Sequence, residues 1–329
     1  MKIRILGGGW YGTHLALALR GEHDVTLYEA SDTLFSGASG NMPGRLHLGF
    51  HYPRSKLTRN ACQDHYRRFM DRYGHLTRGV AVNVYAIAKD LSLVDFENYM
   101  QTLRGEVEFV RVERPEELGL RNVEGALLTG ERHTVVREAR KWFKEQLGDT
   151  VWYNMKHLPP ESADDLTIDC TFCARESANV DRYEPCLTAI LEGPTDKAVT
   201  IMDGPFPSLY PWDEDAGLVS LTSAALTPLS KAIRSYEGAR ALLRETPASE
   251  LATRSQAMLE SLKHYYPAVE DCFKVVDYRL AVRAMPLSGA DARLVDVVKT
   301  GERTLRIRAS KLDAIFYAED EIRERIRCL

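Results

Sequence analysis

The sequence predicts an α/β protein in which a domain built on a parallel sheet is combined with a second, sheet-rich α+β domain made of inserted segments. The chain has 329 residues, enough for two domains of ordinary size. A strand pattern, a glycine-rich loop, a helix pattern and a second strand follow one another within the first 30 residues. This order opens a right-handed βαβ unit with a parallel sheet. Strand patterns then dominate the stretch 194–284, which we assign to the second domain.

Composition and charge restrict the class of protein. Hydrophobic residues make up 44% of the chain and charged residues 27%, as in folded globular proteins, which excludes disordered and fibrous classes. A net charge of -4 argues against nucleic acid as the main partner. No apolar run reaches the roughly 18 residues of a membrane helix, and the N-terminus is too short in apolar residues for a signal peptide. We therefore expect a cytoplasmic protein without a membrane span.

The expected elements of the first half follow from apolar spacing. Lys2–Leu6 is an apolar strand, and the helix after the glycine loop carries Leu15, Ala16 and Leu19 on one face. Asp24–Glu29 is the second strand, and a glycine- and serine-rich segment spans 36–52. Later segments are a helix at 57–73, alternating sheet residues at 80–88, and an amphipathic helix at 135–146.

In the second half, strand-like runs are expected at 150–155 and 166–171, followed by further strands from 194 onward. A helix is expected at 249–266 and a strand at 275–286. The chain ends with a strand at 304–309, a turn at Ser310-Lys311 and a helix at Asp313–Arg327. The charged side chains of this last helix form a solvated face.

The first loop has the pattern G-x-G-x-x-G at Gly7, Gly9 and Gly12. Gly7 permits the tight turn, Gly9 lets a pyrophosphate approach the backbone, and Gly12 allows close packing of helix on strand. Trp10 and Tyr11 lie within the pattern, where the helix N-terminus offers free N–H groups and a positive dipole end to phosphates. The pattern therefore predicts a dinucleotide site.

Glu29 supports this interpretation, because it ends the second strand 17 residues after Gly12. A carboxylate there can accept hydrogen bonds from two ribose hydroxyls and would repel a 2′-phosphate. These features leave NAD and FAD both open.

Two cysteines and two histidines have spacings that occur in metal or redox sites. Cys170 and Cys173 have the CxxC spacing, but no second CxxC or histidine pair completes a zinc site. A structural role at a strand exit and a redox or metal role both remain open. His47 and His51 are four residues apart in a glycine-containing segment without an evident third ligand. We predict no metal site and reduced thiols.

Segment 36–52 (SGASGNMPGRLHLGFHY) resembles the second flavin-contacting loop of the FAD-dependent D-amino acid oxidase superfamily. The nearest likeness is to the L-2-hydroxyglutarate oxidase and glycerol-3-phosphate dehydrogenase branches, with their Leu/Ile-His-x-Gly-x-x-Tyr run. Ser208-Leu209-Tyr210-Pro211, Val282-Arg283-Ala284 and Ser310-Lys311-Leu312 resemble further segments of that family. The resemblance covers most of the chain.

The resemblance implies a Rossmann-like, glutathione-reductase-like FAD-binding domain at 1–75, 130–190 and 285–329. The substrate domain would comprise 76–129 and 191–284. The implied FAD contacts are Gly7, Gly9, Trp10, Tyr11, Gly12, Glu29, Ser39, Gly40, Asn41, Arg45, Leu46, His47, Lys156, Thr171, Arg283, Ser310, Lys311 and Leu312.

Three departures from the family pattern place the substrate class in question. Thr171-Phe172 stands where the family usually has a small pair such as Ala-Gly. Ser310 replaces a glycine, and Asp313 replaces a threonine. The chain is also shorter than typical members, which points to a reduced or more open substrate domain.

The implied activity is FAD-dependent removal of a hydride from the carbon that bears an amine or hydroxyl of a small substrate, giving an imine or ketone. We expect this substrate to contain a carboxylate, which Arg283 would hold in a bidentate clamp. His51, Tyr52 and Tyr210 are the other catalytic candidates, each with a packed structural side chain as the alternative, and His47 or His51 could take a substrate proton.

The electron acceptor would be O2 or another compound, and the oligomeric state is left open. The reduced substrate domain hints at a biosynthetic step. An NAD-dependent dehydrogenase and a flavin-binding protein without redox turnover remain alternatives.

Overall fold

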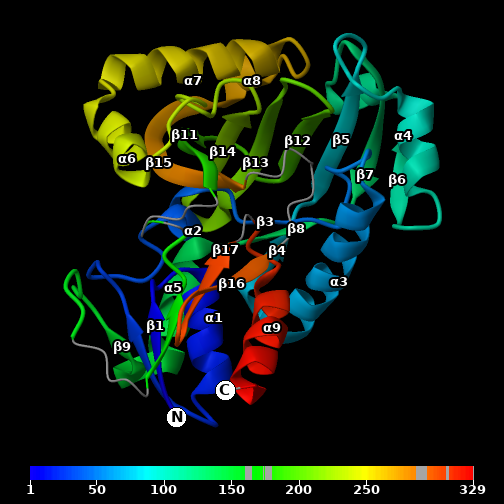
Figure 1. Ribbon diagram of the computed structural model, residues 1–329. Helices are drawn as coiled ribbons and strands as arrows, with labels where there is room; N and C mark the ends of the chain where they lie inside the picture. Colours follow the sequence, from blue (N-terminus) through cyan, green and yellow to red (C-terminus); the bar gives the residue numbers. More distant parts are fainter. Residues whose placement is uncertain (160–164, 173, 175–179, 287–294, 309–310, 329) are drawn as a thin grey trace.

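The computed structural model describes residues 1–159, 165–172, 174, 180–286, 295–308 and 311–328. Two large sheets lie in the two halves of the molecule, and a small sheet lies between them (Figure 1). This arrangement confirms the predicted combination of an α/β domain with a sheet-rich domain. The boundaries predicted for the two domains stay a proposal.

The first sheet has the strand order β16-β17-β10-β1-β2-β9. Its strands are β1 (Lys2–Leu6), β2 (Asp24–Tyr28), β9 (Val151–Trp152), β10 (Leu166–Asp169), β16 (Asp296–Gly301) and β17 (Thr304–Arg308). All neighbours pair in parallel except β16 and β17, which are antiparallel. Because β1 lies inside the sheet, its apolar residues Ile3 and Ile5 are buried.

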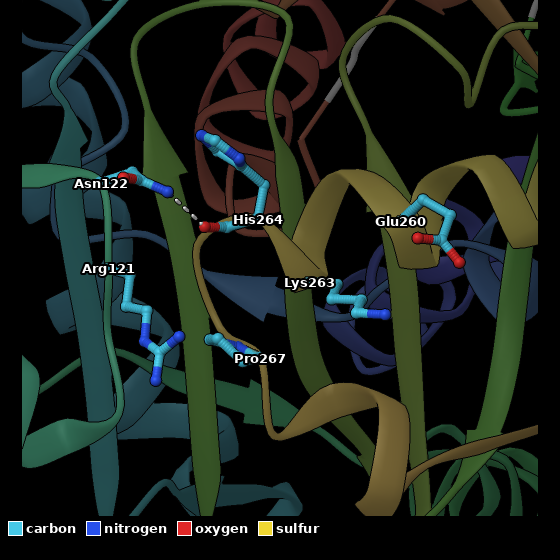
Figure 2. A pocket seen from close by; sticks show the side chains of 6 residues that line it. All are labelled: Arg121, Asn122, Glu260, Lys263, His264 and Pro267. Carbon is cyan, nitrogen blue, oxygen red and sulfur yellow. Dashed lines mark hydrogen bonds between the residues drawn. The ribbon is translucent and has the colours of Figure 1, made fainter.

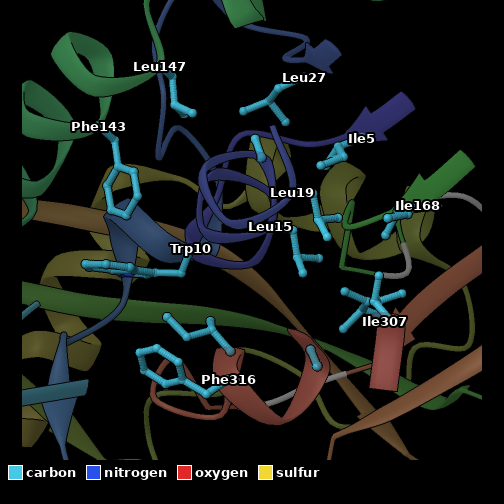
Figure 3. Packing of buried hydrophobic residues seen from close by; sticks show 14 of the residues in the cluster. Ile5, Trp10, Leu15, Leu19, Leu27, Phe143, Leu147, Ile168, Ile307 and Phe316 are labelled. Atoms are coloured by element: carbon cyan, nitrogen blue, oxygen red, sulfur yellow. The ribbon is translucent and has the colours of Figure 1, made fainter. Parts of the chain in front are cut away.

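Three helices pack around this sheet: α1 (Trp10–Leu19), α5 (Val136–Leu147) and α9 (Ile315–Arg327). Figure 3 shows Leu15 and Leu19 of α1 beside apolar side chains of the sheet, with Trp10 near Phe143 and Phe316. The rings of Trp10 and Phe143 meet edge to face with centroids 5.6 Å apart. This packing fixes the N-terminal end of α1, which directly follows the glycine loop.

A buried polar contact also joins α1 to α9. His14 Nε2 lies 3.0 Å from the Glu319 carboxylate, and its Nδ1 is 2.8 Å from the hydroxyl of Tyr73. These contacts secure the C-terminal helix against the first helix of the chain.

The second sheet has the order β15-β11-β14-β13-β12-β5-β7-β6 and is antiparallel except for the parallel pair β12 and β5. Its strands are β5 (Val82–Ala88), β6 (Phe109–Val112), β7 (Val123–Thr129), β11 (Val180–Glu192), β12 (Lys197–Met202), β13 (Pro207–Asp213), β14 (Leu218–Ser223) and β15 (Lys274–Pro286). The helices beside it are α4 (Phe96–Leu103), α6 (Tyr236–Glu245), α7 (Ala248–Lys263) and α8 (Val269–Cys272).

Side-chain alternation divides the two faces of this sheet. Val84 and Ala86 of β5 belong to the core under α7, whereas Tyr85 and Ile87 pack with Phe50 and helix α4. The face of Tyr85 is therefore the one that meets the segment resembling a flavin loop.

The third sheet, β3-β8-β4, consists of β3 (Arg45–Leu46), β4 (Thr77–Gly79) and β8 (Arg132–Thr134). The short helix α2 (Ala38–Asn41) precedes it, and α3 (Lys56–Tyr73) connects β3 to β4. Leu46 is fully buried in the core of the first domain, whereas Arg45 points to the second sheet. The small sheet thus carries residues of segment 36–52 from one domain to the other.

Most of the predicted elements are observed, but several observed elements were not predicted, among them α4, β6, β7 and β8. The predicted strand at 150–155 has only two residues in the sheet. Helix α6 was not predicted although its sequence is amphipathic, and only Ala239 of its residues is buried. Strand β16 was not predicted either, because most of its residues are exposed and its sequence lacks the apolar run of a buried strand. In the described ranges, no helix is both long and apolar enough to cross a membrane.

Candidate active site

The glycine loop between β1 and α1 has no room for side chains. Gly7 has a φ of +98°, and a Cβ there would lie 2.9 Å from the carbonyl oxygen of Cys170. A Cβ on Gly12 would lie 1.9 Å from the Gly7 carbonyl oxygen, so helix and loop touch through backbone alone. A Cβ on Gly9 would lie 2.8 Å from Ser39 Oγ. Side chains at these positions would meet other atoms, so the loop packs closely against its neighbours.

The N-terminus of α1 receives no cap from its own N-cap residue, and Ser39 of another segment takes that place. Its N-cap is Gly9, and the Trp10 N–H donates to Ser39 Oγ at 3.1 Å. Ser39 and Gly40 belong to α2, where a Cβ on Gly40 would lie 1.9 Å from the Phe35 carbonyl oxygen. The structure thus brings the predicted loop residues Ser39 and Gly40 against the glycine loop.

Asn41 has a local role in the same turn. Its Nδ2 donates to the carbonyl oxygens of Ser36 and Gly37 at 2.8 and 2.9 Å. These bonds shape the loop that follows Glu29.

Glu29 is a buried carboxylate at the center of this loop cluster. Its Oε2 accepts from the Gly8 N–H at 2.6 Å. Its Oε1 accepts from the N–H and the hydroxyl of Ser31 at 2.9 and 2.8 Å, and from Ser36 Oγ at 3.2 Å. The carboxylate therefore connects the glycine loop to the end of β2.

Two more predicted contacts lie beside this cluster. The N–H of Met155, next to Lys156, donates to the Glu29 carbonyl oxygen at 2.9 Å. At the exit of β10, the N–H and Oγ1 of Thr171 donate to Asp169 Oδ1 at 3.0 and 2.6 Å. Both segments thus border the glycine loop, but Thr171 has its hydroxyl engaged. Cys173 of the CxxC pair lies outside the described residues.

Lys311 connects the first domain to segment 36–52. Its carbonyl oxygen accepts from the Tyr11 hydroxyl at 2.5 Å, and its ammonium lies 3.9 Å from the centroid of the Tyr52 ring. The ammonium also lies 2.6 Å from Cys62 Sγ. Burial works against the charge, but the electrostatic effects of Tyr52, Asp313 and Cys62 leave the pKa of Lys311 raised.

The neighbours of Lys311 complete this junction. Burial raises the pKa of the Cys62 thiol to about 11, so the thiol stays neutral beside the ammonium. Leu312 packs against the core of the first domain, and Ser310 lies outside the described residues. Lys311 is therefore a buried cation held between α1, α3 and the loop that contains Tyr52.

His47, His51 and Tyr52 form an aromatic group next to Lys311. The ring centroid of His47 lies 5.6 Å from that of His51 and 5.9 Å from that of Tyr52. His51 also approaches Tyr85 of the second sheet, with ring centroids 6.5 Å apart. The structure brings these three predicted residues together where the two domains meet.

Arg45 joins this group to the second sheet. Its Nη1 donates to Ser208 Oγ at 2.8 Å, and its Nη2 donates to the Tyr85 hydroxyl at 2.6 Å and to Thr200 Oγ1 at 3.0 Å. Its guanidinium lies 4.4 Å from the centroid of the Tyr210 ring. Arg45 and Tyr210, both predicted from the resemblance, are thus in direct contact.

The sequence did not reveal Glu131, which is the carboxylate of this cluster. Glu131 is 1% exposed and follows the turn after β7. Its oxygens accept from the Leu48 N–H at 2.7 Å and from the Tyr85 hydroxyl at 2.5 Å, and His47 Nδ1 lies 3.5 Å away. A Gly-Glu pair in a turn usually indicates an exposed carboxylate, so no signal in the sequence marked this residue.

Arg283 lies apart from this group in the contacts of the described residues. It pairs with Glu184 of β11, because the antiparallel register sets these two residues opposite each other. Nε and Nη2 of Arg283 donate to Glu184 Oε2 at 3.1 and 2.5 Å. The sequence has no Asp or Glu next to Arg283, and the fold supplies Glu184 from a distant strand.

The described surface also contains a hollow away from these residues. It measures about 380 Å³ and is lined by Arg121, Asn122, Glu260, Lys263, His264 and Pro267 (Figure 2). It lies where β5 and β7 meet through Ala88 and Val123, at the opposite end of that strand pair from Glu131. None of its lining residues is a predicted site residue.

Among the described residues, no three His, Cys, Asp or Glu side chains gather as metal ligands would. The glycine loop, the helix N-terminus that follows it and the buried Glu29 after β2 define the dinucleotide-binding class of protein.

Comparisons with known proteins give the family. The family model described as FAD dependent oxidoreductase (DAO) matches residues 2–145. FAD-dependent monooxygenase FPY4 of Fusarium mangiferae is 33% identical over 98% of this chain and 90% of its own. FAD-dependent monooxygenase kojA of Aspergillus flavus is 28% identical over 86% of this chain and 76% of its own. The chain belongs to the DAO family of FAD-dependent oxidoreductases.

Solved structures support the fold. Glycine oxidase from Geobacillus kaustophilus matches with a TM-score of 0.65 and 14% identity over 96% of this chain and 91% of its own. Glycine oxidase from Bacillus cereus matches with a TM-score of 0.68 and 12% identity over 98% of this chain and 95% of its own. The protein is therefore an FAD-dependent enzyme, and the predicted superfamily and cofactor are confirmed.

The residues of the glycine loop fit FAD. Gly7, Gly9 and Gly12 contribute no side chains of their own at the start of α1, and Ser39 places a hydroxyl there that can donate a hydrogen bond to a pyrophosphate. Glu29 has a carboxylate at the end of β2, where a ribose would lie in this fold.

Proposed function

We propose that the protein is an oxidoreductase that takes a hydride from the carbon bearing an amine or hydroxyl of a small, carboxylate-containing substrate, giving an imine or ketone. The observation that supports this most is the continuous chain of contacts from Tyr11 through Lys311, Tyr52 and His47 to Tyr85 of the second sheet. FAD supplies the hydride acceptor when bound. The residues of the chain orient the substrate against it.

The predicted roles are retained as part of this proposal. The glycine loop, Glu29 and Lys311 would hold FAD, with Arg45 and His47 on the side of the second sheet. Arg283 would hold the substrate carboxylate, since Glu184 engages only two of its five donors in the part of the chain that the structure describes.

His51, Tyr52 and Tyr210 would line the substrate site. We also retain a cytoplasmic location, a role in biosynthesis, and O2 or another compound as electron acceptor.

The names of the relatives favour a second candidate, monooxygenation of the substrate. Both curated relatives are named FAD-dependent monooxygenases, and one covers nearly the whole chain. In that case an oxygen atom from O2 would enter the product, whereas hydride removal alone transfers none.

The test uses the purified FAD-loaded protein with a panel of amino acids and hydroxy acids under anaerobic conditions. Bleaching of the flavin bands by one of these compounds, with the matching imine-derived keto acid or ketone as product, is the expected result. Repeating the reaction under ¹⁸O2 separates the two candidates, because label in the product identifies a monooxygenase. A protein that binds FAD but is never bleached would contradict hydride removal, and a colourless protein that takes up no FAD would contradict flavin binding.

A further inference from the structure

We propose that Glu131 is a positioning residue that orients the His47 ring and fixes its proton, so that His47 Nε2 receives the proton of the substrate amine or hydroxyl. This inference rests on the proposed function. As the bond between the proton and the substrate nitrogen or oxygen breaks, a bond from the proton to Nε2 forms, and the neutral imidazole becomes imidazolium. FAD, when bound, would supply the acceptor for the hydride of the neighbouring carbon, so the electron pair and both hydrogens of the substrate are accounted for.

The geometry holds the carboxylate and the ring in one unit. Glu131 accepts from the N–H of Leu48, the residue directly after His47, at 2.7 Å. Its other oxygen lies 3.5 Å from His47 Nδ1 and accepts from the Tyr85 hydroxyl at 2.5 Å. The carboxylate therefore anchors the backbone of this segment through Leu48 and lies beside the His47 ring at ion-pair distance, and Tyr85 fixes it to the second sheet.

The charges favour an ionised carboxylate beside a neutral ring. Burial by itself would raise the pKa of Glu131, but His47, Arg45 and the hydrogen bond from Tyr85 hold that pKa below its usual value. Burial lowers the pKa of His47, and Glu131 opposes this only in part. The imidazole is thus neutral near pH 7, and the ionised carboxylate 3.5 Å from Nδ1 favours the single ring proton on that nitrogen. Nε2 is then the basic nitrogen.

The surroundings of His47 come from four parts of the fold. The groups that face it are Glu131 after β7, Arg45 of β3, Lys311 before α9, and the rings of His51 and Tyr52 in its own segment. Arg45 and Lys311 are cations that disfavour protonation, and Glu131 is the carboxylate among these neighbours. Loss of the Glu131 charge must therefore lower the pKa of His47 further.

A purely structural role for Glu131 makes a different prediction. The carboxylate could serve only to neutralise Arg45 through the Tyr85 hydroxyl, without acting on the ring. Loosening the cluster would then affect His47 in the same way whichever member is changed. Two conservative variants separate these cases: Glu131→Gln removes the charge, and Tyr85→Phe removes the hydroxyl but keeps the charge.

The measurement is ¹⁵N NMR of histidine-labelled, FAD-loaded protein across a pH series, with the His47 signals assigned from a His47→Gln variant. In the unaltered protein we expect the proton of the neutral ring on Nδ1. Glu131→Gln should lower the pKa of His47 and reduce the Nδ1-protonated share, whereas Tyr85→Phe should keep the tautomer and not lower the pKa. The glutamine variant should also lose about 10²-fold in kcat with little change in KM, and the acidic limb of its pH profile should move to lower pH.

Three results would overturn the proposal. These are an Nε2-protonated ring in the unaltered protein, equal shifts in both variants, and an unchanged pKa in Glu131→Gln. The tautomer measurement needs only the unaltered protein, so it decides the question even if the glutamine variant does not fold. It also needs no substrate, so failure to find a substrate would count against the proposed function and not against this arrangement.

Discussion

Replacing Glu29 by alanine tests the dinucleotide site at its most connected residue. The Glu29 carboxylate is 6% exposed and accepts hydrogen bonds from Gly8, Ser31 and Ser36. A hydrogen bond to a charged group contributes about 1.5–3 kcal/mol, and a ribose adds at most two hydroxyl donors. The hydroxyl donors that lose the carboxylate form hydrogen bonds to water instead, so the net loss is smaller than the sum of two such bonds. We therefore expect Glu29→Ala to weaken FAD binding by about 1–3 kcal/mol, or about 5- to 160-fold in Kd.

The assay is titration of the apoprotein with FAD, followed by the change in flavin fluorescence. Glu29→Gln should lose less affinity than Glu29→Ala, because one amide oxygen still accepts a hydrogen bond. Asp24→Ala is the matched control, since Asp24 is an exposed carboxylate at the start of the same strand. It should leave Kd unchanged.

An unchanged Kd in Glu29→Ala would refute the argument. If that variant lowers only the unfolding temperature of the apoprotein, Glu29 is an anchor of the loop and not a ligand of the ribose. The bond from Gly8 to Glu29 makes this outcome a real alternative, because it is present without any cofactor.

Three further predictions concern other parts of the chain. Gly12→Ala should yield protein without bound FAD, because the new Cβ would lie 1.9 Å from a backbone oxygen; normal flavin absorbance after purification would contradict it. Arg283→Lys should keep the flavin spectrum but lose about 2–4 kcal/mol in kcat/KM, and normal turnover in steady-state kinetics would remove Arg283 from substrate binding. Burial would raise the pKa of Glu319, but hydrogen bonds from His14 and Arg323 lower it to about 2. This carboxylate therefore stabilises the fold at pH values above its unfolded pKa of about 4.5, and that stability is lost as pH falls toward 2. Urea unfolding between pH 6 and 3 should therefore show a smaller loss in Glu319→Gln than in the unaltered protein.

The glycine loop could be predicted because its chemistry is local. Gly7, Gly9 and Gly12 lie within six consecutive residues. The strand before them and the helix after them are rich in apolar residues. Helix α3 was predicted to within a residue for the same reason. Where a segment carries its own periodicity or turn chemistry, the sequence contains most of the information needed.

The polar cluster around His47 could not be predicted from its residues, because its partners come from distant segments. The bond between Leu48 and Glu131 spans 83 positions, and the bond between Arg45 and Ser208 spans 163. Family resemblance identified Arg45, His47 and Tyr210 but gave no reason for their contact. Glu131 needed the fold itself, since only the β7–β8 turn brings it beside His47.

Arg283 shows how strand register decides which side chain a residue pairs with. The sequence around it contains no adjacent carboxylate, which made a substrate anion the simplest partner. In the antiparallel pair of β11 and β15, however, Glu184 lies opposite, and a slip of one residue would move it to the other face of the sheet. Because both bonds from Arg283 end on the single oxygen Oε2, the pair is not a fork of two parallel bonds to two oxygens. Glu184 therefore satisfies the charge of Arg283 without using the bidentate geometry that distinguishes arginine from lysine. Arg283→Lys would preserve the pair with Glu184, and so a loss of turnover in that variant would report on the substrate and not on the stability of the strand pair.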